Sequence, residues 1–139
     1  MQQQIMPPWE EVGLIGHSIG GASCLHFLRH HVKEGRLGAL ALVCTAGKFR
    51  LAAEDRQRIQ SFRFMMRGMS GLPVTKAVMI NGLHDPYVPA KYALVLAKIL
   101  RAKLVFTESG GHFGLTDPRN STRELPAHAQ GLILSAFGL

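Results

Sequence analysis

The chain has 139 residues, of which 47% are hydrophobic, and it carries a formal net charge of +7. This composition excludes a disordered chain, and the length suits one packed domain, which we expect to span residues 1–139. The excess of positive charge would suit an anionic partner. However, the basic residues are scattered, with no run and no nucleic-acid motif, so we favour a solvated basic surface over nucleic-acid binding.

Alternating strands and helices are predicted along the chain. Residues 1–10 form a polar lead-in, because Pro7 and Pro8 disfavour regular structure. We expect strands at 11–16, Leu37–Cys44, Lys76–Asn81 and Lys103–Thr107, and helices at about 19–33, 52–68, 90–101 and from Pro126 onward. This alternation predicts an α/β fold whose sheet has about four parallel strands, joined by right-handed crossovers.

The expected helices each have an apolar face. The faces expected to be buried are Ala22, Leu25, Leu28 and Val32 in the first helix, Leu94, Val95 and Leu100 in the third, and Ala129, Leu132, Ile133 and Phe137 in the last. The segment 47–71 differs, because its helix carries phenylalanines and methionines on one side and arginines on the other. That apolar side either packs in the core, the commoner case, or forms a lid over a substrate pocket.

The most informative stretch is Val12–Ala22, in which Gly-x-Ser-x-Gly joins an expected strand to an expected helix. This arrangement is typical of a nucleophile elbow, with Ser18 held above the edge of the sheet. Gly16 and Gly20 are expected to prevent clashes across the tight turn. The first turn of the helix directs free N–H groups at any anion beside Ser18, so the N–H of Ile19 is the expected oxyanion donor.

Other glycine-loop interpretations fit this stretch less well. It contains no Gly-x-Gly-x-x-Gly, which excludes the dinucleotide fingerprint. Gly16 and Gly21 have the spacing of a phosphate loop, but Ala22 stands where that loop requires lysine. A strand–turn–helix with small residues for close packing remains the structural alternative.

Three polar side chains follow the ends of three different expected strands. They are Ser18, Asp85 and His112, and the carboxyl ends of parallel strands meet at one edge of a sheet. A neutral histidine can take the proton of a serine hydroxyl, and a carboxylate can orient that histidine and stabilise its charged form. The order Ser…Asp…His is that of α/β-hydrolases. The alternative is a surface histidine and an aspartate that only starts a turn before Pro86.

Several further residues are expected near the substrate. His17 is expected to shape the pocket, and His84 is the second candidate for the base or a gate. Phe113, Met65 and Met66 are expected to line the pocket. His26 and His30 lie four apart on one helical face, as metal ligands do, but no Glu lies between them in the metalloprotease pattern. We therefore expect no metal and no cofactor.

Cellular location is predicted from absent signals and from the cysteines. The N-terminus lacks the features of a signal peptide, and no apolar run approaches the length that spans a bilayer. Cys24 and Cys44 have neither metal-ligand nor disulfide-framework spacing, which is typical of buried free thiols in a reducing compartment. We expect a cytoplasmic protein that does not associate with a membrane.

Three segments carry a family resemblance: Ile15-Gly16-His17-Ser18, Gly82-Leu83-His84-Asp85-Pro86-Tyr87-Val88-Pro89 and Thr107-Glu108-Ser109-Gly110-Gly111-His112-Phe113. They resemble the small serine hydrolases related to retinoblastoma-binding protein 9. The resemblance covers Val12 to Gly114 and fades over Gly47–Gly71, where the family's tryptophan-rich stretch is missing. It implies a three-layer α/β-hydrolase fold, with Ser18 as nucleophile, Asp85 as acid and His112 as base. Because that tryptophan-rich stretch is replaced, the family's substrate preference does not carry over to this chain. The expected hydrolase would cleave a small-molecule ester, thioester or amide through an acyl-enzyme on Ser18.

One departure from this family affects the expected activity. Family members have earlier strands before the elbow, and the loop after the first of them carries part of the oxyanion hole. Here only about eleven residues precede that strand, so the expected fold is truncated and the second oxyanion donor has no visible source. One edge of strand 11–16 is also left unpaired, so we expect a fragment, a short isoform, or half of an assembly in which a homo-oligomer or a strand-completing partner covers that edge. Two functions therefore stay open: a serine hydrolase, and a weak or inactive hydrolase-like module for binding or assembly.

Overall fold

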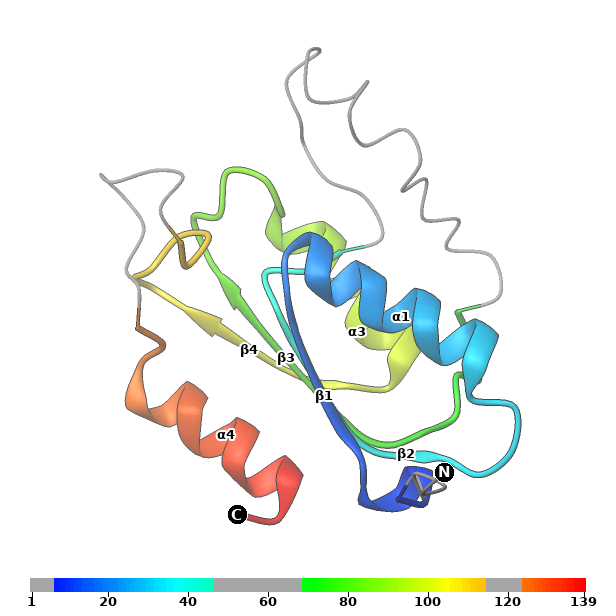
Figure 1. Ribbon diagram of the computed structural model, residues 1–139. Coiled ribbons are helices and arrows are strands. Elements are labelled where there is room, and N and C mark those ends of the chain that lie inside the picture. Colours follow the sequence, from blue (N-terminus) through cyan, green and yellow to red (C-terminus); the bar gives the residue numbers. More distant parts are fainter. Residues whose placement is uncertain (1–6, 47–68, 115–123) are drawn as a thin grey trace.

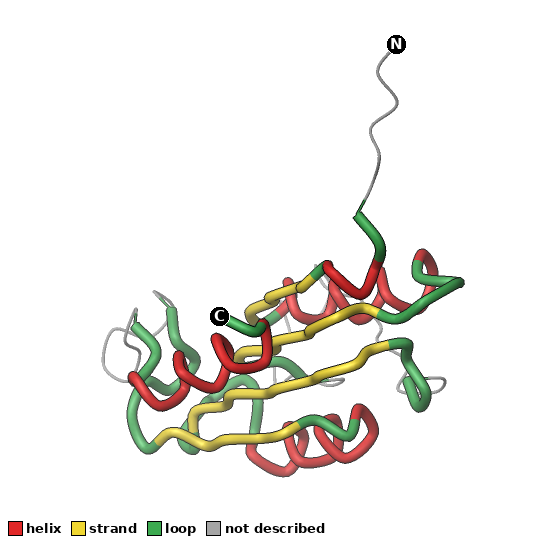
Figure 2. Tube along the Cα trace, turned by 90° about the horizontal axis from the view of Figure 1, so that it is seen from below, coloured by secondary structure: helices red, strands yellow, loops and turns green. Residues whose placement is uncertain are grey.

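Four parallel strands form one sheet in the computed structural model, which describes residues 7–46, 69–114 and 124–139. The strands are β1 (Gly13–His17), β2 (Leu37–Val43), β3 (Val74–Gly82) and β4 (Lys103–Thr107). They lie side by side in the order β1-β2-β3-β4 (Figure 2). The predicted α/β class with a parallel sheet is confirmed.

Helices cover both faces of this sheet. Helices α1 (Ile19–His31) and α3 (Ala90–Leu100) pack on one face, and α4 (Ala127–Phe137) packs on the other (Figure 1). Successive side chains of a strand point to opposite faces, so Leu40 and Leu42 of β2 join the core under α1 and α3. Ala41 and Val43 join the core under α4. The sheet is thus the middle of three layers, which explains the continuous apolar sequence of β2.

The register places the ends of all four strands at one edge of the sheet. His17 pairs with Val43, Val43 with Ile80, and Gly82 with Thr107. The loops that leave the strands therefore emerge together, and we call this side the carboxyl edge. The opposite side, where the strands begin, is the amino edge.

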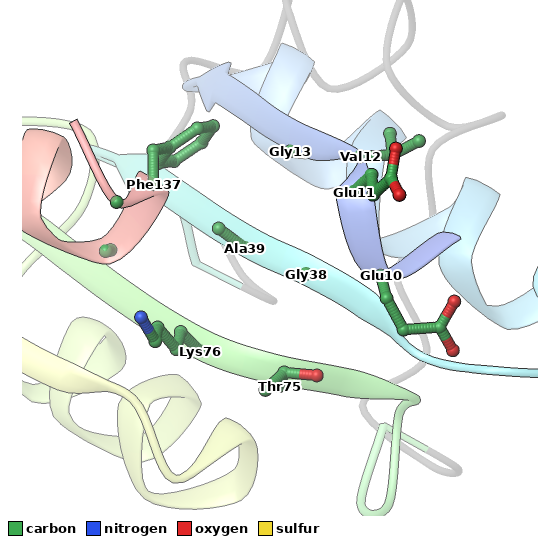
Figure 3. Close-up of a pocket in the computed structure, with 11 residues that line it drawn as sticks. Glu10, Glu11, Val12, Gly13, Gly38, Ala39, Thr75, Lys76 and Phe137 are labelled. Carbon is green, nitrogen blue, oxygen red and sulfur yellow. The ribbon is translucent and has the colours of Figure 1, made fainter. Parts of the chain in front are cut away.

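The amino edge holds a shallow pocket of about 310 Å³ (Figure 3). It lies between the first residues of β1, β2 and β3 and the end of α4, and Phe137 extends over Gly13 there. The charged residues at this pocket, Glu10, Glu11 and Lys76, are exposed. This pocket and the residues that follow the strand ends lie at opposite edges of the sheet.

The lead-in and β3 differ in detail from the sequence-based expectation. A short 3-10 helix, η1 (Trp9–Glu11), follows the prolines, where no regular structure was expected. The ring of Trp9 packs edge-on against Phe27 of α1, with ring centroids 5.8 Å apart, and this contact holds the turn in place. Strand β3 starts two residues before Lys76 and ends one residue after Asn81.

The predicted buried face of α3 is confirmed at Leu100 and wrong at Leu94 and Val95. Leu94 and Val95 are 53% and 52% exposed, whereas Ala93, Leu96, Ala97 and Leu100 are buried. These four positions have the spacing i, i+3, i+4 and i+7 of a single helical face. Because almost every residue of α3 is apolar, the sequence pattern did not show which face meets the sheet.

The other predicted helical faces agree with the structure. In α1, Ala22, Leu25 and Leu28 are buried, and in α4 Ala129 and Ile133 are buried. Leu132 and Phe137 are half-buried against the same cluster. Cys24 is half-buried rather than buried as expected, because it lies at the side of α1 that borders solvent. The expected helix 52–68, with Met65 and Met66, lies outside the described residues, so the lid and the single-domain assignment stay predictions.

Two observations bear on the surroundings of the fold. In the described part of the chain, no helix combines the length and the apolar composition that crossing a bilayer requires. Strand β1 is an edge strand, because its outer side pairs with no other strand among the described residues. Ile15 on this strand is 59% exposed.

Candidate active site

Ser18 occupies the sharp turn between β1 and α1. Its backbone has φ 53° and ψ −121°, a strained combination for a residue with a side chain. Neighbouring groups hold this conformation: the Ser18 N–H donates to the carbonyl of Val43 at 2.9 Å. The Thr45 hydroxyl lies 3.1 Å from the carbonyl oxygen of Ser18. The turn therefore has the backbone strain expected of a nucleophile elbow.

The glycines around this turn have different roles. A Cβ on Gly16 would collide with the backbone of Gly21, and a Cβ on Gly21 would collide with the side chain of Thr45. By contrast, a Cβ on Gly20 meets no atom within 4 Å. The expected clearance role is confirmed for Gly16 and wrong for Gly20, because it is Gly21 that faces the adjacent strand end.

The Ser18 hydroxyl faces His112 rather than its own helix. Serine is a favoured N-cap residue, and Ser18 holds the N-cap position of α1, yet its side chain makes no capping hydrogen bond. Its Oγ lies 2.9 Å from Nε2 of His112. The Ser18 side chain thus leaves the first N–H groups of α1, including that of Ile19, available for a negatively charged group.

Asp85 uses both carboxylate oxygens. Oδ1 accepts hydrogen bonds from the backbone N–H groups of Tyr87 at 2.8 Å and Val88 at 2.9 Å. Oδ2 accepts from Nδ1 of His112 at 2.8 Å. The two sequence interpretations of Asp85 are therefore compatible, because one oxygen forms the turn before Pro86 and the other orients the imidazole.

Asn81 supports this turn, and the sequence pattern did not single it out. Its side-chain amide donates to the carbonyls of Gly82 at 2.9 Å and Val88 at 3.0 Å. Asn81 is fully buried at the end of β3, where an apolar residue would be usual. The signal in the sequence was a polar residue that directly follows the apolar, buried run in the second half of β3.

His112 is held from several sides. Gly82 has no Cβ, which lets the carbonyl of Gly111 approach the end of β3 closely. The His17 side chain lies 2.6 Å from the carbonyl oxygen of His112, to which its Nε2–H can donate. The ring of Tyr87 packs edge-on to the imidazole, with centroids 4.9 Å apart. With Nδ1–H donated to Asp85, Nε2 is free to accept the hydroxyl proton of Ser18.

Cys44 is a buried neighbour of these groups that the sequence did not place here. It follows β2 with φ 48°, and its Sγ lies 3.5 Å from the carbonyl oxygen of Gly111. Burial, and then the negative charge of Asp85, raise the pKa of the Cys44 thiol well above its usual range. Without a bound cation the thiol therefore stays protonated, and its role here is not that of a nucleophile.

The remaining predicted pocket residues lie in different surroundings. His17 is exposed beside Ser18, and its ring centroid is 5.0 Å from that of His112. His84 is exposed on the turn after β3, whereas His112 occupies the position between Ser18 and Asp85. Phe113 is 8% exposed and packs in the core under α4. The pocket roles of these residues stay predictions.

Comparison with known proteins links this geometry to a family. A family model described as serine hydrolase matches residues 1–123. The ydeN gene product from B. subtilis has a similar structure, with a TM-score of 0.72 and 26% identity over 95% of this chain. SOBER1 from Arabidopsis thaliana (TM-score 0.59, 18% identity) and the esterase domain of a Rhodothermus marinus protein (0.56, 19%) share the fold, each over 97% of this chain. No match was found among curated proteins.

This chain is shorter than the solved structures that it resembles. It spans 68% of the ydeN gene product, 55% of SOBER1 and 62% of the esterase domain.

Proposed function

The chain belongs to the serine hydrolase family, of the α/β-hydrolase type, and on that basis we propose that it hydrolyses a small-molecule ester, thioester or amide through an acyl-enzyme on Ser18. One observation carries the proposal. The Ser18 hydroxyl lies 2.9 Å from one nitrogen of His112, and Asp85 lies 2.8 Å from the other. Side chains so far apart in the sequence meet in the geometry that activates a serine.

The proposed acylation step uses all three side chains. Oγ of Ser18 attacks the carbonyl carbon of the substrate while its proton moves to Nε2 of His112. The Asp85 carboxylate stabilises the resulting imidazolium through Nδ1–H. The C=O electron pair moves to the carbonyl oxygen, and the N–H of Ile19 at the start of α1 is the donor proposed to stabilise it.

Collapse of the tetrahedral intermediate completes acylation, and hydrolysis of the acyl-enzyme then completes the cycle. The bond to the leaving group breaks, and His112 gives its proton to that group. A water molecule then attacks the acyl carbon while its proton moves to His112. When this second intermediate collapses, the bond to Oγ of Ser18 breaks, His112 returns the proton to Oγ, and the acid product leaves. Loss of one oxyanion donor typically costs about a hundred- to thousandfold in turnover, so we expect turnover to depend strongly on whether a second donor acts together with the N–H of Ile19.

Labelling with a fluorophosphonate probe tests this proposal. Such probes phosphonylate a serine only when a neighbouring base activates it. We expect labelling of the wild-type chain at pH 7 to 8 and none of Ser18→Ala, with both proteins folded by circular dichroism. A folded wild-type chain that stays unlabelled, or a Ser18→Ala variant that labels equally, would contradict the proposal.

The free edge of β1 favours a second candidate function, that of a hydrolase-like module for binding or assembly. Ile15 is 59% exposed beside backbone groups that pair with no strand among the described residues. Such an edge favours pairing with a strand from a second copy or another protein. A folded chain that elutes as a defined oligomer and does not label would support this alternative over hydrolysis.

We also propose a cytoplasmic location. Cys24 and Cys44 are both free thiols, and reducing compartments keep thiols unpaired. Fractionation of cells that express the tagged chain tests this.

A further inference from the structure

Three potential metal ligands converge at the carboxyl edge. A ring nitrogen of His17, Sγ of Cys44 and a ring nitrogen of His112 all lie within 4.8 Å of one another. They come from the end of β1, the residue after β2 and the loop after β4. We propose that these side chains bind Zn²⁺, or a divalent metal ion with the same preference for nitrogen and sulfur ligands, and that the bound ion inhibits the enzyme. The inhibitory part rests on the proposed function, whereas the binding part does not.

The set of donors suits zinc. Zn²⁺ takes cysteine sulfur at about 2.3 Å and histidine nitrogen at about 2.0 to 2.1 Å, and three protein ligands leave a fourth position for water. In a tetrahedral complex with these bond lengths, two nitrogens and one sulfur lie about 3.3 to 3.6 Å apart. The ligand atoms lie within 4.8 Å of one another, so each pair needs to approach by about 1.5 Å at most to bind one ion. Softer sulfur ligands exclude Mg²⁺ and Ca²⁺ as the preferred ions.

The surroundings favour a cation and give it a way in. Cys44 and His112 are buried, but His17 is exposed, so an ion can reach the cluster from the His17 side. The carboxylate of Asp85 lies next to the cluster, bonded to His112. The charge of the ion is balanced by the Cys44 thiolate and by Asp85, and the thiol proton is released to solvent on binding.

Binding at this cluster is incompatible with the proposed catalysis. Nδ1 of His112 is bonded to Asp85 and Nε2 to Ser18, so coordination through either nitrogen breaks one contact that the triad needs. Coordination through Nε2 of His17 also releases the carbonyl of His112, which this side chain contacts at 2.6 Å. A bound ion therefore holds the base in an inactive arrangement.

A second pair of histidines supplies a matched control. His26 and His30 lie on the exposed side of α1 with ring centroids 4.3 Å apart, and they offer two nitrogen ligands without a thiol. Cys24, the other free cysteine, lies on the same helix. Variants at these positions remove other metal-binding groups and leave the proposed cluster intact.

Cobalt spectroscopy tests binding without any need for activity. Co²⁺ added to the wild-type chain should give a thiolate-to-cobalt charge-transfer band in the near ultraviolet. The band should be lost in Cys44→Ala and should persist in Cys24→Ala and in the double variant His26→Ala/His30→Ala. Absence of the band from the folded wild-type chain would overturn the site. Loss of the band in Cys24→Ala together with its persistence in Cys44→Ala would also overturn it.

Inhibition by zinc tests the consequence. Fluorophosphonate labelling of the wild-type chain should fall as Zn²⁺ is added and should recover with a chelator. Relative to its own labelling without zinc, Cys44→Ala should need at least tenfold more Zn²⁺ for half-inhibition. Equal sensitivity of Cys44→Ala, or of Cys44→Ser if the alanine variant does not fold, would overturn the inhibitory role. If the wild-type chain does not label at all, the proposed function fails, while the cobalt band still decides whether the site exists.

Discussion

The two edges of the sheet differ in where the structure places strain and buried polar groups. The buried polar or charged side chains of the described residues all lie at the carboxyl edge: Thr45, Asn81, Asp85, Thr107 and His112. Three of the four non-glycine residues with positive φ also lie there, namely Ser18, Cys44 and Phe113. At the amino edge, the pocket in Figure 3 is bordered by charged residues that remain in water.

This difference shows how one sheet separates stability from chemistry. Burying polar groups and straining backbone cost free energy, which the packed cores on both faces of the sheet offset. The cost is confined to the edge where a fixed hydroxyl, imidazole and carboxylate are held in place. Substitutions at the two edges should therefore have different effects on turnover and on stability.

The largest effect should come from Ser18→Ala. Removing the proposed nucleophile leaves only the catalysis from binding and the oxyanion site, so we expect at least a thousandfold loss of turnover. Stability should change little, because the Ser18 side chain is only half-buried and its removal breaks the hydrogen bond to His112 without touching the backbone hydrogen bonds of the turn. Ester turnover and thermal unfolding of the same preparation measure both. Equal turnover in the variant would place the chemistry elsewhere.

Asp85→Asn should lower turnover by about a hundred- to ten-thousandfold. The amide keeps the size of the carboxylate but favours the wrong tautomer of His112 and does not stabilise its charged form. Glu11→Gln makes the same chemical change at the amino edge, where the carboxylate is exposed. We expect the activity of Glu11→Gln to equal that of the wild type. Similar losses in the two variants would remove the distinction between the edges.

The sequence predicted those parts of the fold that depend on short-range patterns. The strand order along the chain, the continuous apolar β2 and the elbow at Ser18 all follow from apolar runs and glycine spacing. The positions of Ser18, Asp85 and His112 after three strands also placed them at one edge, because parallel strands end together. The meeting of these side chains therefore followed from topology rather than from distance along the chain.

Features that depend on packing between distant segments were not predictable in this way. Every position of α3 from Ala93 to Ala97 is apolar, so only contact with the sheet decides that Leu94 and Val95 face solvent. Gly21 rather than Gly20 needs to be small because of Thr45, which follows a different strand. Cys44 joins the site for the same reason, since only the sheet register brings it beside Gly111.

The two adjacent glycines of the elbow provide a smaller and more specific test. Gly21→Ala should lower the free energy of unfolding by about 1 to 3 kcal/mol, because the new methyl group collides with Thr45 at the carboxyl edge. Gly20→Ala should be neutral or stabilising by up to about 1 kcal/mol, because alanine favours the helix and open space receives its Cβ. Chemical denaturation of both variants measures the difference. Equal destabilisation would contradict the assigned contact.

The smallest effect should appear in the dependence of stability on pH. Burial and Asp85 raise the pKa of the Cys44 thiol in the folded chain, whereas the unfolded thiol titrates near about 8.5. Below that pH both states hold the proton and stability does not depend on it. Above it only the unfolded state loses the proton, so stability falls by up to about 1.4 kcal/mol per pH unit.

Denaturation at pH 7.5 and 9.5 should show this fall in the wild type and a smaller one in Cys44→Ala. Cys24 is only half-buried and its pKa is raised by burial alone, without Asp85, so Cys24→Ala should keep most of the fall. An identical dependence in all three proteins would show that the carboxyl edge does not hold the Cys44 thiol in its protonated form.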